Sequence, residues 1–228
     1  MTQRDEIIEI QNLSKFVGTG DLHVEILKNI NLNIYLNQIT VIAGNSGAGK
    51  STLMNIIGLL DEKSKGQYTI LGKDVDSLSE SSKNTLRGDI FGIIFQAYNL
   101  INYLNVQENV MLSLVKKKNM TKKEKKEVVY SSLEKVGMIG RKNHFPTTLS
   151  GGEQQRVAIA RCLAASPKVV LADEPTGNVD AENEQIILNL FKEITKEGKA
   201  VIAVTHSDRV KAIADKLYYI KNGIVEGA

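Results

Sequence analysis

The sequence predicts an α/β fold in which an N-terminal antiparallel β part precedes a parallel sheet and a helical part is inserted before the last strands. The apolar, β-branched run at residues 39–43 predicts a buried strand, and it leads through a glycine-rich loop into a helical pattern. The apolar runs at residues 168–174 and 200–205 predict two more buried strands. Alternating apolar residues over 7–13 and 24–35 predict the antiparallel strands.

Length and composition predict a single domain over residues 1–228. The chain has 228 residues, of which 42% are hydrophobic and 24% charged, as is ordinary for a globular protein. A net charge of +3 is too small to indicate nucleic acid, and we expect no such partner. The single cysteine, Cys162, excludes an internal disulfide, and its apolar helical surroundings predict burial. The chain starts without an apolar signal-peptide core, and no run of about 18 apolar residues predicts a membrane span.

The β-rich part of the chain continues on both sides of the glycine-rich loop. Phe16 falls in the turn region between the two antiparallel strands, where an aromatic side chain either joins the core or stacks on a base. Strand character returns at residues 66–71, and a turn then leads into a polar stretch at 76–84. The apolar run at residues 90–95 predicts a strand that ends in Gln96.

The glycine-rich loop predicts a phosphate site. Residues 44–52 fit the pattern G-x-x-x-x-G-K-[ST] in the strand, loop and helix context that this pattern requires. Backbone N–H groups and the positive end of the helix then point at phosphates. Lys50 is expected to reach the β- and γ-phosphates of a nucleoside triphosphate, and Ser51 to hold Mg²⁺. The predicted phosphate-binding residues are Gly44, Asn45, Ser46, Gly47, Ala48, Gly49, Lys50, Ser51 and Thr52.

Residues 97–165 differ from the rest of the chain because their patterns are mainly helical. Apolar residues recur at helical spacing over 109–115 and 125–136. Between them lies a lysine-rich run at 116–126, which is typical of a solvated helix end or linker. Contact with anionic lipid or nucleic acid is the alternative, although no aromatic residues are interleaved to stack on bases.

A second turn with the character of an anion site begins at Leu149-Ser150-Gly151-Gly152-Glu153. Ser150 suits a helix N-cap, and Glu153 lies three residues later, as in a capping box. The residues at 157–165 have the composition of the helix that such a cap would start. The turn is therefore either a helix cap alone or a second anion-binding helix end.

The last third of the chain contributes two adjacent acids at the end of a buried strand. Asp173 suits a carboxylate that orients Mg²⁺, and Glu174 suits a general base for an attacking water. Their position downstream of a phosphate loop favours catalysis over a merely solvated turn. An amphipathic helix is predicted at 183–196, and a closing hairpin turns at Asn222-Gly223.

In this order, the motifs resemble the nucleotide-binding domain of the ATP-binding cassette (ABC) transporters over essentially the whole chain. They are the phosphate loop at 44–52, Gln96, the signature LSGGE at 149–153, LADE at 171–174, Asp180 and His206. The resemblance implies a P-loop NTPase, RecA-like core at 1–96 and 166–228 with the antiparallel β subdomain. Residues 97–165 would then form the helical subdomain that carries the signature.

The resemblance also implies individual roles. Phe16 would stack on adenine, Gln96 would sense Mg²⁺ and the γ-phosphate, and His206 would contact the γ-phosphate and position the water. Lys50 and Glu174 would complete the catalytic set, and Ser51, Gln96 and Asp173 would hold the metal. A second copy of the chain would supply Leu149, Ser150, Gly151, Gly152, Glu153 and Asp180 to the same ATP.

Residues around Gln96 and Glu174 narrow the resemblance to the branch of MacB, LolD, FtsE and the peptide-antibiotic exporters. The resemblance implies ATP-driven export of a peptide, lipoprotein or hydrophobic antibiotic at the cytoplasmic face of the bacterial inner membrane. A permease would dock near residues 96–105 and, since the chain stops at Ala228, would be a separate polypeptide. The alternatives are an FtsE-like regulatory ATPase that transports nothing and a soluble ABC protein. Asn45, Asn37-Gln38 and Val179 depart from the residues usual in the family.

Overall fold

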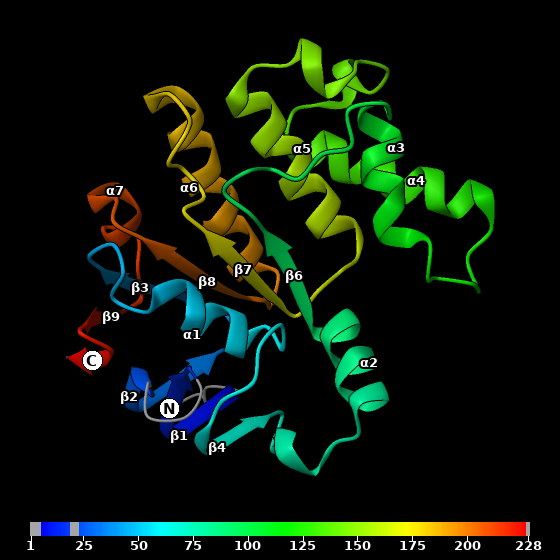
Figure 1. Cartoon of the computed structure of the whole chain (residues 1–228). Helices are drawn as coiled ribbons and strands as arrows, with labels where there is room; N and C mark the ends of the chain where they lie inside the picture. The colour runs from blue at the N-terminus through cyan, green and yellow to red at the C-terminus, as the bar shows by residue number, and fades with distance from the viewer. Residues whose placement is uncertain (1–5, 19–22, 227–228) are drawn as a thin grey trace.

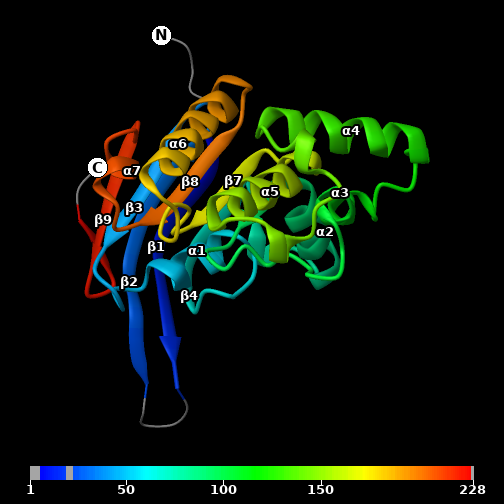
Figure 2. The ribbon, with the colours of Figure 1, turned by 90° about the horizontal axis from the view of Figure 1, so that it is seen from above.

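The computed structural model describes residues 6–18 and 23–226. Two β-sheets and a group of helices form the molecule, with the helices α3, α4 and α5 gathered at one end of the larger sheet (Figure 1). Viewed from above, the hairpin of β1 and β2 projects from the body of the molecule, far from α4 (Figure 2).

The smaller sheet is antiparallel, in the order β2-β1-β4-β5. The larger sheet has the order β10-β9-β3-β8-β7-β6, in which β9, β3, β8, β7 and β6 are parallel and β10 closes an antiparallel hairpin. The strands are β1 Glu6–Val17, β2 Val24–Tyr35, β3 Ile39–Gly44, β4 Lys65–Ile70, β5 Lys73–Asp74, β6 Phe91–Ile94, β7 Val169–Asp173, β8 Ala200–Thr205, β9 Lys216–Lys221 and β10 Ile224–Glu226.

The described helices include short 3-10 turns between the longer α-helices. The α-helices are α1 Lys50–Ile57, α2 Glu80–Ile90, α3 Val106–Met111, α4 Lys122–Lys135, α5 Gly151–Ala164, α6 Ala181–Lys196 and α7 Asp208–Lys211. The 3-10 turns are η1 Val75–Ser77, η2 Leu112–Leu114, η3 Ile139–Arg141 and η4 Pro146–Thr148. In the described part of the chain no helix combines the length and the apolar character needed to cross a membrane.

The parallel strands are buried on both faces, and this explains their nearly continuous apolar sequences. In β8, Val201 and Ala203 pack with the helices α3 to α6, whereas Ile202 and Val204 face α1 and the antiparallel sheet. The helix α1 therefore lies between the two sheets, with Leu53 and Ile57 fully buried. The predicted α/β fold with an antiparallel part and an inserted helical part is confirmed.

Three local predictions need correction. Phe16 lies within β1, not in a turn, because the β1–β2 ladder continues to Val17 opposite Val24. The polar stretch at 76–84 leads into a helix, α2, which Ser79 caps by accepting a hydrogen bond from the N–H of Ser82. Ile90 ends that helix, so β6 begins one residue later than predicted.

A single buried amide organises the chain between β6 and α3. Asn109 is fully buried, and its Nδ2 donates to the carbonyl oxygens of Ile101, Leu104 and Asn105 at 2.9–3.1 Å. Its Oδ1 accepts the N–H of Ile101 at 2.8 Å. The side chain of Asn109 thus makes four hydrogen bonds with backbone groups of residues 101–105. These bonds hold the end of the loop at 97–105 to α3.

Replacing this amide tests its role. Asn109→Ala would leave the backbone groups around Ile101 without partners, so the free energy of unfolding is expected to fall by about 3 kcal/mol. Urea denaturation followed by circular dichroism measures the change. The control is Asn102→Ala, an exposed residue of the same loop, which should change stability by no more than about 0.5 kcal/mol. Equal effects of the two substitutions would contradict the assignment.

Candidate functional site

Four adjacent parallel strands end at one edge of the larger sheet, and the loops that follow them form a cleft of about 720 Å³. Binding sites of parallel sheets lie at this carboxyl edge. The cleft is lined by Ile26, Gly44, Asn45, Ser46, Gly47, Gly49, Lys50, Ser51, Thr52, Gln96, Asp173, Glu174 and His206. The fold thus brings together the phosphate loop after β3, His206 after β8, the two acids after β7 and Gln96 after β6.

The phosphate loop is pressed against neighbouring strands, and this requires glycine. A Cβ atom at Gly44 would lie 2.3 Å from the carbonyl oxygen of Ile220 in β9. Gly49 has a φ of 103° and forms the N-cap of α1, and a Cβ there would lie 2.8 Å from Cδ2 of Leu27. Within the described chain no side chain caps α1, so its first N–H groups remain directed at the cleft.

Lys50 is the cation of the cleft. Its Nζ donates to the carbonyl oxygens of Gly44 and Asn45 at 2.9 and 3.0 Å, which holds the ammonium group over the loop. Ser51 and Thr52 follow it on the first turn of α1 and also line the cleft. Ala48 alone of the predicted loop residues does not line the cleft, because it is buried in the core beneath.

Asp173 and Glu174 leave β7 in different environments. Burial raises the pKa of Asp173, the neighbouring charge of Glu174 raises it further, and Lys50 opposes both effects. Glu174 has a φ of 41°, a left-handed conformation that is strained for a residue with a Cβ. The Glu174 carboxylate contacts Thr205 and His206, whereas the charge of Lys50 acts on Asp173.

Glu174 is held by three groups from the end of β8. Its Oε2 accepts the hydroxyl of Thr205 at 2.9 Å and the N–H of His206 at 3.4 Å. Its Oε1 lies 2.9 Å from Nδ1 of His206. The Glu174 side chain is only 13% exposed and the His206 side chain 74%, so the buried carboxylate orients an imidazole that faces the cleft.

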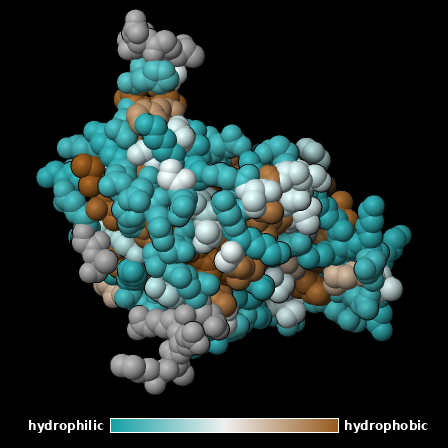
Figure 3. Space-filling model, turned by 90° about the horizontal axis from the view of Figure 1, so that it is seen from below, coloured by the Kyte–Doolittle hydropathy of each residue, from teal (hydrophilic) through white to brown (hydrophobic). Residues whose placement is uncertain are grey.

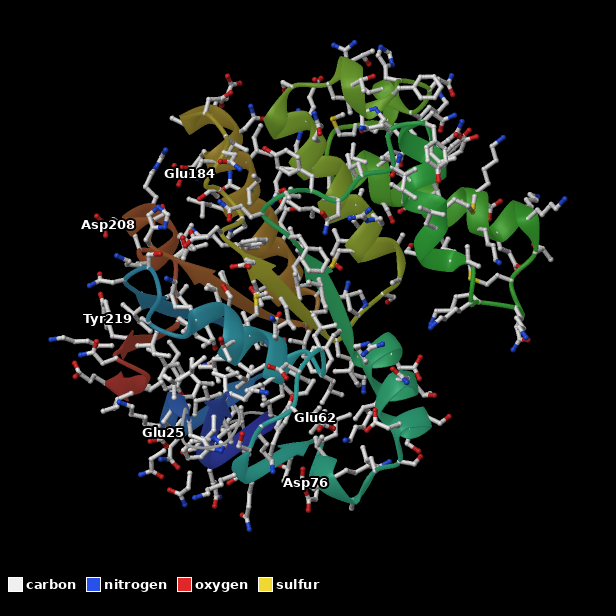
Figure 4. All side chains as sticks on the ribbon, in the orientation of Figure 1. Glu25, Glu62, Asp76, Glu184, Asp208 and Tyr219 are labelled. Carbon is white, nitrogen blue, oxygen red and sulfur yellow. The ribbon has the colours of Figure 1, made fainter. Side chains whose placement is uncertain are left out.

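The segment after His206 is tied to α6. The Ser207 hydroxyl donates to Oε1 of Glu184 at 3.0 Å, and Nη1 of Arg209 lies 2.8 Å from Oε2 of the same residue. Figure 4 labels Glu184 on α6 and Asp208 on α7, the two elements that this network joins. Asp180 is the N-cap of the same helix, so His206 and Asp180 are connected through α6.

The signature residues 149–153 do not line this cleft. Ser150 caps α5 in a full capping box, with the Glu153 carboxylate accepting the Ser150 N–H at 2.9 Å and thereby lowering the pKa of Glu153. A Cβ atom at Gly152 would clash with the side chain of Asn183. Asn183 in turn binds the carboxylate of Asp180, whose pKa this contact lowers. Leu149 is buried behind the cap.

Phe16 lies outside the lining of the cleft. Its N–H donates to the hydroxyl of Ser64 at 3.0 Å, and the Lys65 ammonium sits 5.1 Å from the centre of its ring. The cleft is bordered instead by Ile26 of β2, two residues after the start of that strand. The sequence carried no signal for Ile26, since it is one of several apolar residues in an alternating run.

The motifs and their geometry agree with a comparison against known protein families. The model of the family described as ABC transporter matches residues 27–177. The chain belongs to the ABC transporter family. It is accordingly an ABC ATPase and the ATP-binding subunit of an ABC transporter.

Relatives of this cassette include both long and short proteins. The macrolide export ATP-binding/permease protein MacB of Mannheimia succiniciproducens is 41% identical over 217 residues, 95% of this chain and 34% of that protein. The chain thus spans about a third of the MacB proteins it matches. The uncharacterized ABC transporter ATP-binding protein YvrO of Bacillus subtilis is also 41% identical, and the match covers 95% of this chain and 94% of YvrO.

Solved structures confirm the ABC cassette fold. The cassette MJ0796, a dimer in a post-hydrolysis state bound to ADP and Pi, matches with a TM-score of 0.89, 37% identity and 97% coverage of both chains. The structure of cbiO1 from Clostridium perfringens, part of the transporter complex cbiONQ, matches with a TM-score of 0.88 and 31% identity, covering 98% of this chain and 88% of that one.

The hydrogen bond from Thr205 to Glu174 generates a prediction for this ATPase. Thr205→Val keeps the shape of a fully buried side chain but removes the donor to the carboxylate, so kcat is expected to fall about tenfold. ATP affinity should stay unchanged, because Thr205 does not line the cleft. Steady-state ATPase assays and nucleotide titration measure the two quantities.

Thr205→Ser is the matched control, since it retains the hydroxyl and should retain most of the activity. A Thr205→Val enzyme with unaltered kcat would show that the hydrogen bond does not position Glu174.

Proposed function

We propose that two copies of this chain close around two ATP molecules and that the cycle of closure and hydrolysis drives export through a membrane permease. The proposal rests on one observation: some of the family's motifs line the cleft, and the signature turn does not. The cleft collects the phosphate loop, both acids, Gln96 and His206, whereas the signature turn faces elsewhere. A second copy that presents its signature turn to this cleft would complete the site.

In the proposed reaction Glu174 takes a proton from a water that attacks the γ-phosphate, and His206 positions that water. The contact between Oε1 of Glu174 and Nδ1 of His206 supports this pairing. Lys50 contributes positive charge beside the phosphates. No covalent enzyme intermediate is needed, because water is the nucleophile.

The residues present fit a magnesium ion. Ser51, Gln96 and Asp173 all line the cleft and offer hydroxyl, amide and carboxylate oxygens, the donors that Mg²⁺ prefers. When bound, the ion would neutralise part of the phosphate charge during transfer.

The second copy would bind through the N-terminus of α5. Ser150 is exposed and Gly151 is half-buried at this helix end, whereas Gly152 is buried against Asn183. The exposed part of the turn is the part proposed to meet an anion. Asp180, also exposed, lies beside it through Asn183, so both would approach the same phosphates. The dimeric form of MJ0796 supports this arrangement. Phe16 is proposed to stack on adenine from the β1 edge of the cleft.

The permease is proposed to dock on residues 96–105 at the border of the helical subdomain, 97–165. Tyr103 is 79% exposed there, and Leu100 packs against the core beneath. Arg161 donates to the carbonyl oxygens of Tyr98 and Asn99, two consecutive residues in the left-handed conformation. Arg161 thereby anchors the loop to α5. The Tyr98 hydroxyl donates to the carbonyl of Asn178 at 3.4 Å, which connects the loop to the segment before Asp180.

Export is proposed because the MacB relatives are 37–41% identical to this chain. The cargo class is a hydrophobic antibiotic, a peptide or a lipoprotein, and the site of action is the cytoplasmic face of a bacterial inner membrane.

A pair of variants tests the shared site. Glu174→Gln should bind ATP, lose hydrolysis by roughly a hundredfold or more, and accumulate as a dimer with ATP in light scattering. Adding Ser150→Arg should abolish that dimer while ATP affinity stays unchanged, because the bulky cation blocks the partner's phosphates. The control adds Ser131→Arg, the same change on an exposed residue of α4, and should dimerise normally. Dimers of the variant with arginine at position 150 would refute the shared site.

A second test concerns docking. Tyr103→Asp places a charge on the exposed apolar surface and should reduce co-purification of the membrane subunit at least about tenfold, with basal ATPase activity retained. Thr147→Asp, exposed but outside the loop, is the control. Undiminished co-purification would exclude the loop at residues 96–105 as the docking site. A captured membrane protein that acts on the cell wall and moves no cargo would favour the regulatory alternative.

A further inference from the structure

We propose that the lysine-rich surface of the helical part binds the anionic headgroups of the membrane that contains the permease. This inference rests on the proposed docking function. The lysine surface is defined as Lys116, Lys117, Lys118, Lys122, Lys123, Lys125 and Lys126, which occupy the loop after η2 and the first turns of α4.

The lysine surface carries an excess of positive charge, with seven lysines against the two carboxylates of Glu124 and Glu127 on the same turns. Within the described chain none of the seven lysines forms an ion pair with a carboxylate. Glu124, the acid within the run, is engaged in the capping box of Thr121. The positive end of the α4 dipole adds to the same field, since these lysines precede or open the helix.

Apolar groups accompany the lysines. Val115 is 65% exposed directly before the run, and Leu112 is 38% exposed on η2. Met111 and the stems of Lys122, Lys125 and Lys126 line a groove of about 350 Å³ between α3 and α4. In the view from below, hydrophilic residues cover the end of the molecule that carries α4 in Figure 1, with hydrophobic residues beside them (Figure 3).

This combination fits a lipid surface better than a nucleic acid. Exposed valine and leucine gain free energy at the boundary between headgroups and acyl chains, whereas a phosphate backbone offers them nothing. No aromatic residue falls within the run 116–126, and the half-buried ring of Tyr130 on α4 lies under the ammonium group of Lys126, 5.4 Å from it. Clusters of four to eight basic residues close to a membrane are sufficient to attract anionic lipids, roughly 1 kcal/mol for each residue.

The position of the lysine surface agrees with this partner. The groove between α3 and α4 is also lined by Gln107 and Glu108, which belong to the helix that begins at Asn105. The proposed docking loop ends at that same Asn105. In this proposal a permease seated on residues 96–105 lies beside the lysine surface, and the lysines face the membrane in which the permease is embedded.

The test is flotation of the full chain with vesicles of phosphatidylglycerol and phosphatidylcholine in equal parts, against vesicles of phosphatidylcholine alone. The chain should bind only the anionic vesicles, and 0.5 M salt should release it, because the Debye length then shrinks to a few ångströms. K117Q/K118Q/K122Q/K123Q should bind at least about tenfold more weakly, with unchanged ATPase activity and thermal midpoint. The matched control, K73Q/K192Q/K196Q/K221Q, removes the same charge from exposed lysines elsewhere and should bind like the wild type.

Three outcomes would overturn the inference: equal binding to both kinds of vesicle, equal loss in the two quadruple variants, or displacement from anionic vesicles by a duplex oligonucleotide at equal phosphate concentration. The last would identify nucleic acid as the partner. Vesicle binding needs no permease, so its failure leaves co-purification through Tyr103 intact. Conversely, undiminished co-purification of the Tyr103→Asp variant, with vesicle binding retained, would overturn the docking proposal on which the membrane orientation depends.

Discussion

The close approach of the phosphate loop to the two sheets is the constraint on which the rest of the structure depends. Gly44 lies against the backbone of Ile220 in β9, and Gly49 lies against Leu27 in β2. A methyl group at either position would push the loop away from one sheet. The helix α1 starts at this loop and fills the space between the sheets with Leu53 and Ile57. The packing of the core and the position of the phosphate loop therefore depend on each other.

The order of the strands determines where the groups that line the cleft lie. Because β3, β8, β7 and β6 are adjacent and parallel, the residues that follow them meet at one edge, although they are far apart in sequence. Local backbone strain and burial then determine the exact position of the Glu174 carboxylate. The left-handed φ of Glu174 turns its carboxylate toward Thr205 and His206, and burial keeps the three groups in one arrangement.

The loop between Gln96 and α3 joins this cleft to the surface. Asn109 and Arg161 satisfy its backbone groups from beneath, and its outer side carries the exposed Tyr103. Tyr98 reaches the chain before Asp180, and Asp180 is linked through α6 to the segment after His206. Few of these contacts are apolar, so a small displacement changes hydrogen-bond geometry at several points at once.

The sequence alone determined the strands, the phosphate loop, the acids at the end of β7 and the capping box at Ser150, because each depends on residues close together in the chain. It also predicted Cys162 to be buried, and burial raises the pKa of that thiol to about 12. It missed α2, whose polar sequence carries little periodicity, and it placed Phe16 in a turn, since a ladder's length depends on the partner strand. Only the tertiary structure decided that Ile26 borders the cleft, that Thr205 holds Glu174 and that the signature turn lies outside it. Such contacts join residues far apart in sequence, and packing, not local preference, selects them.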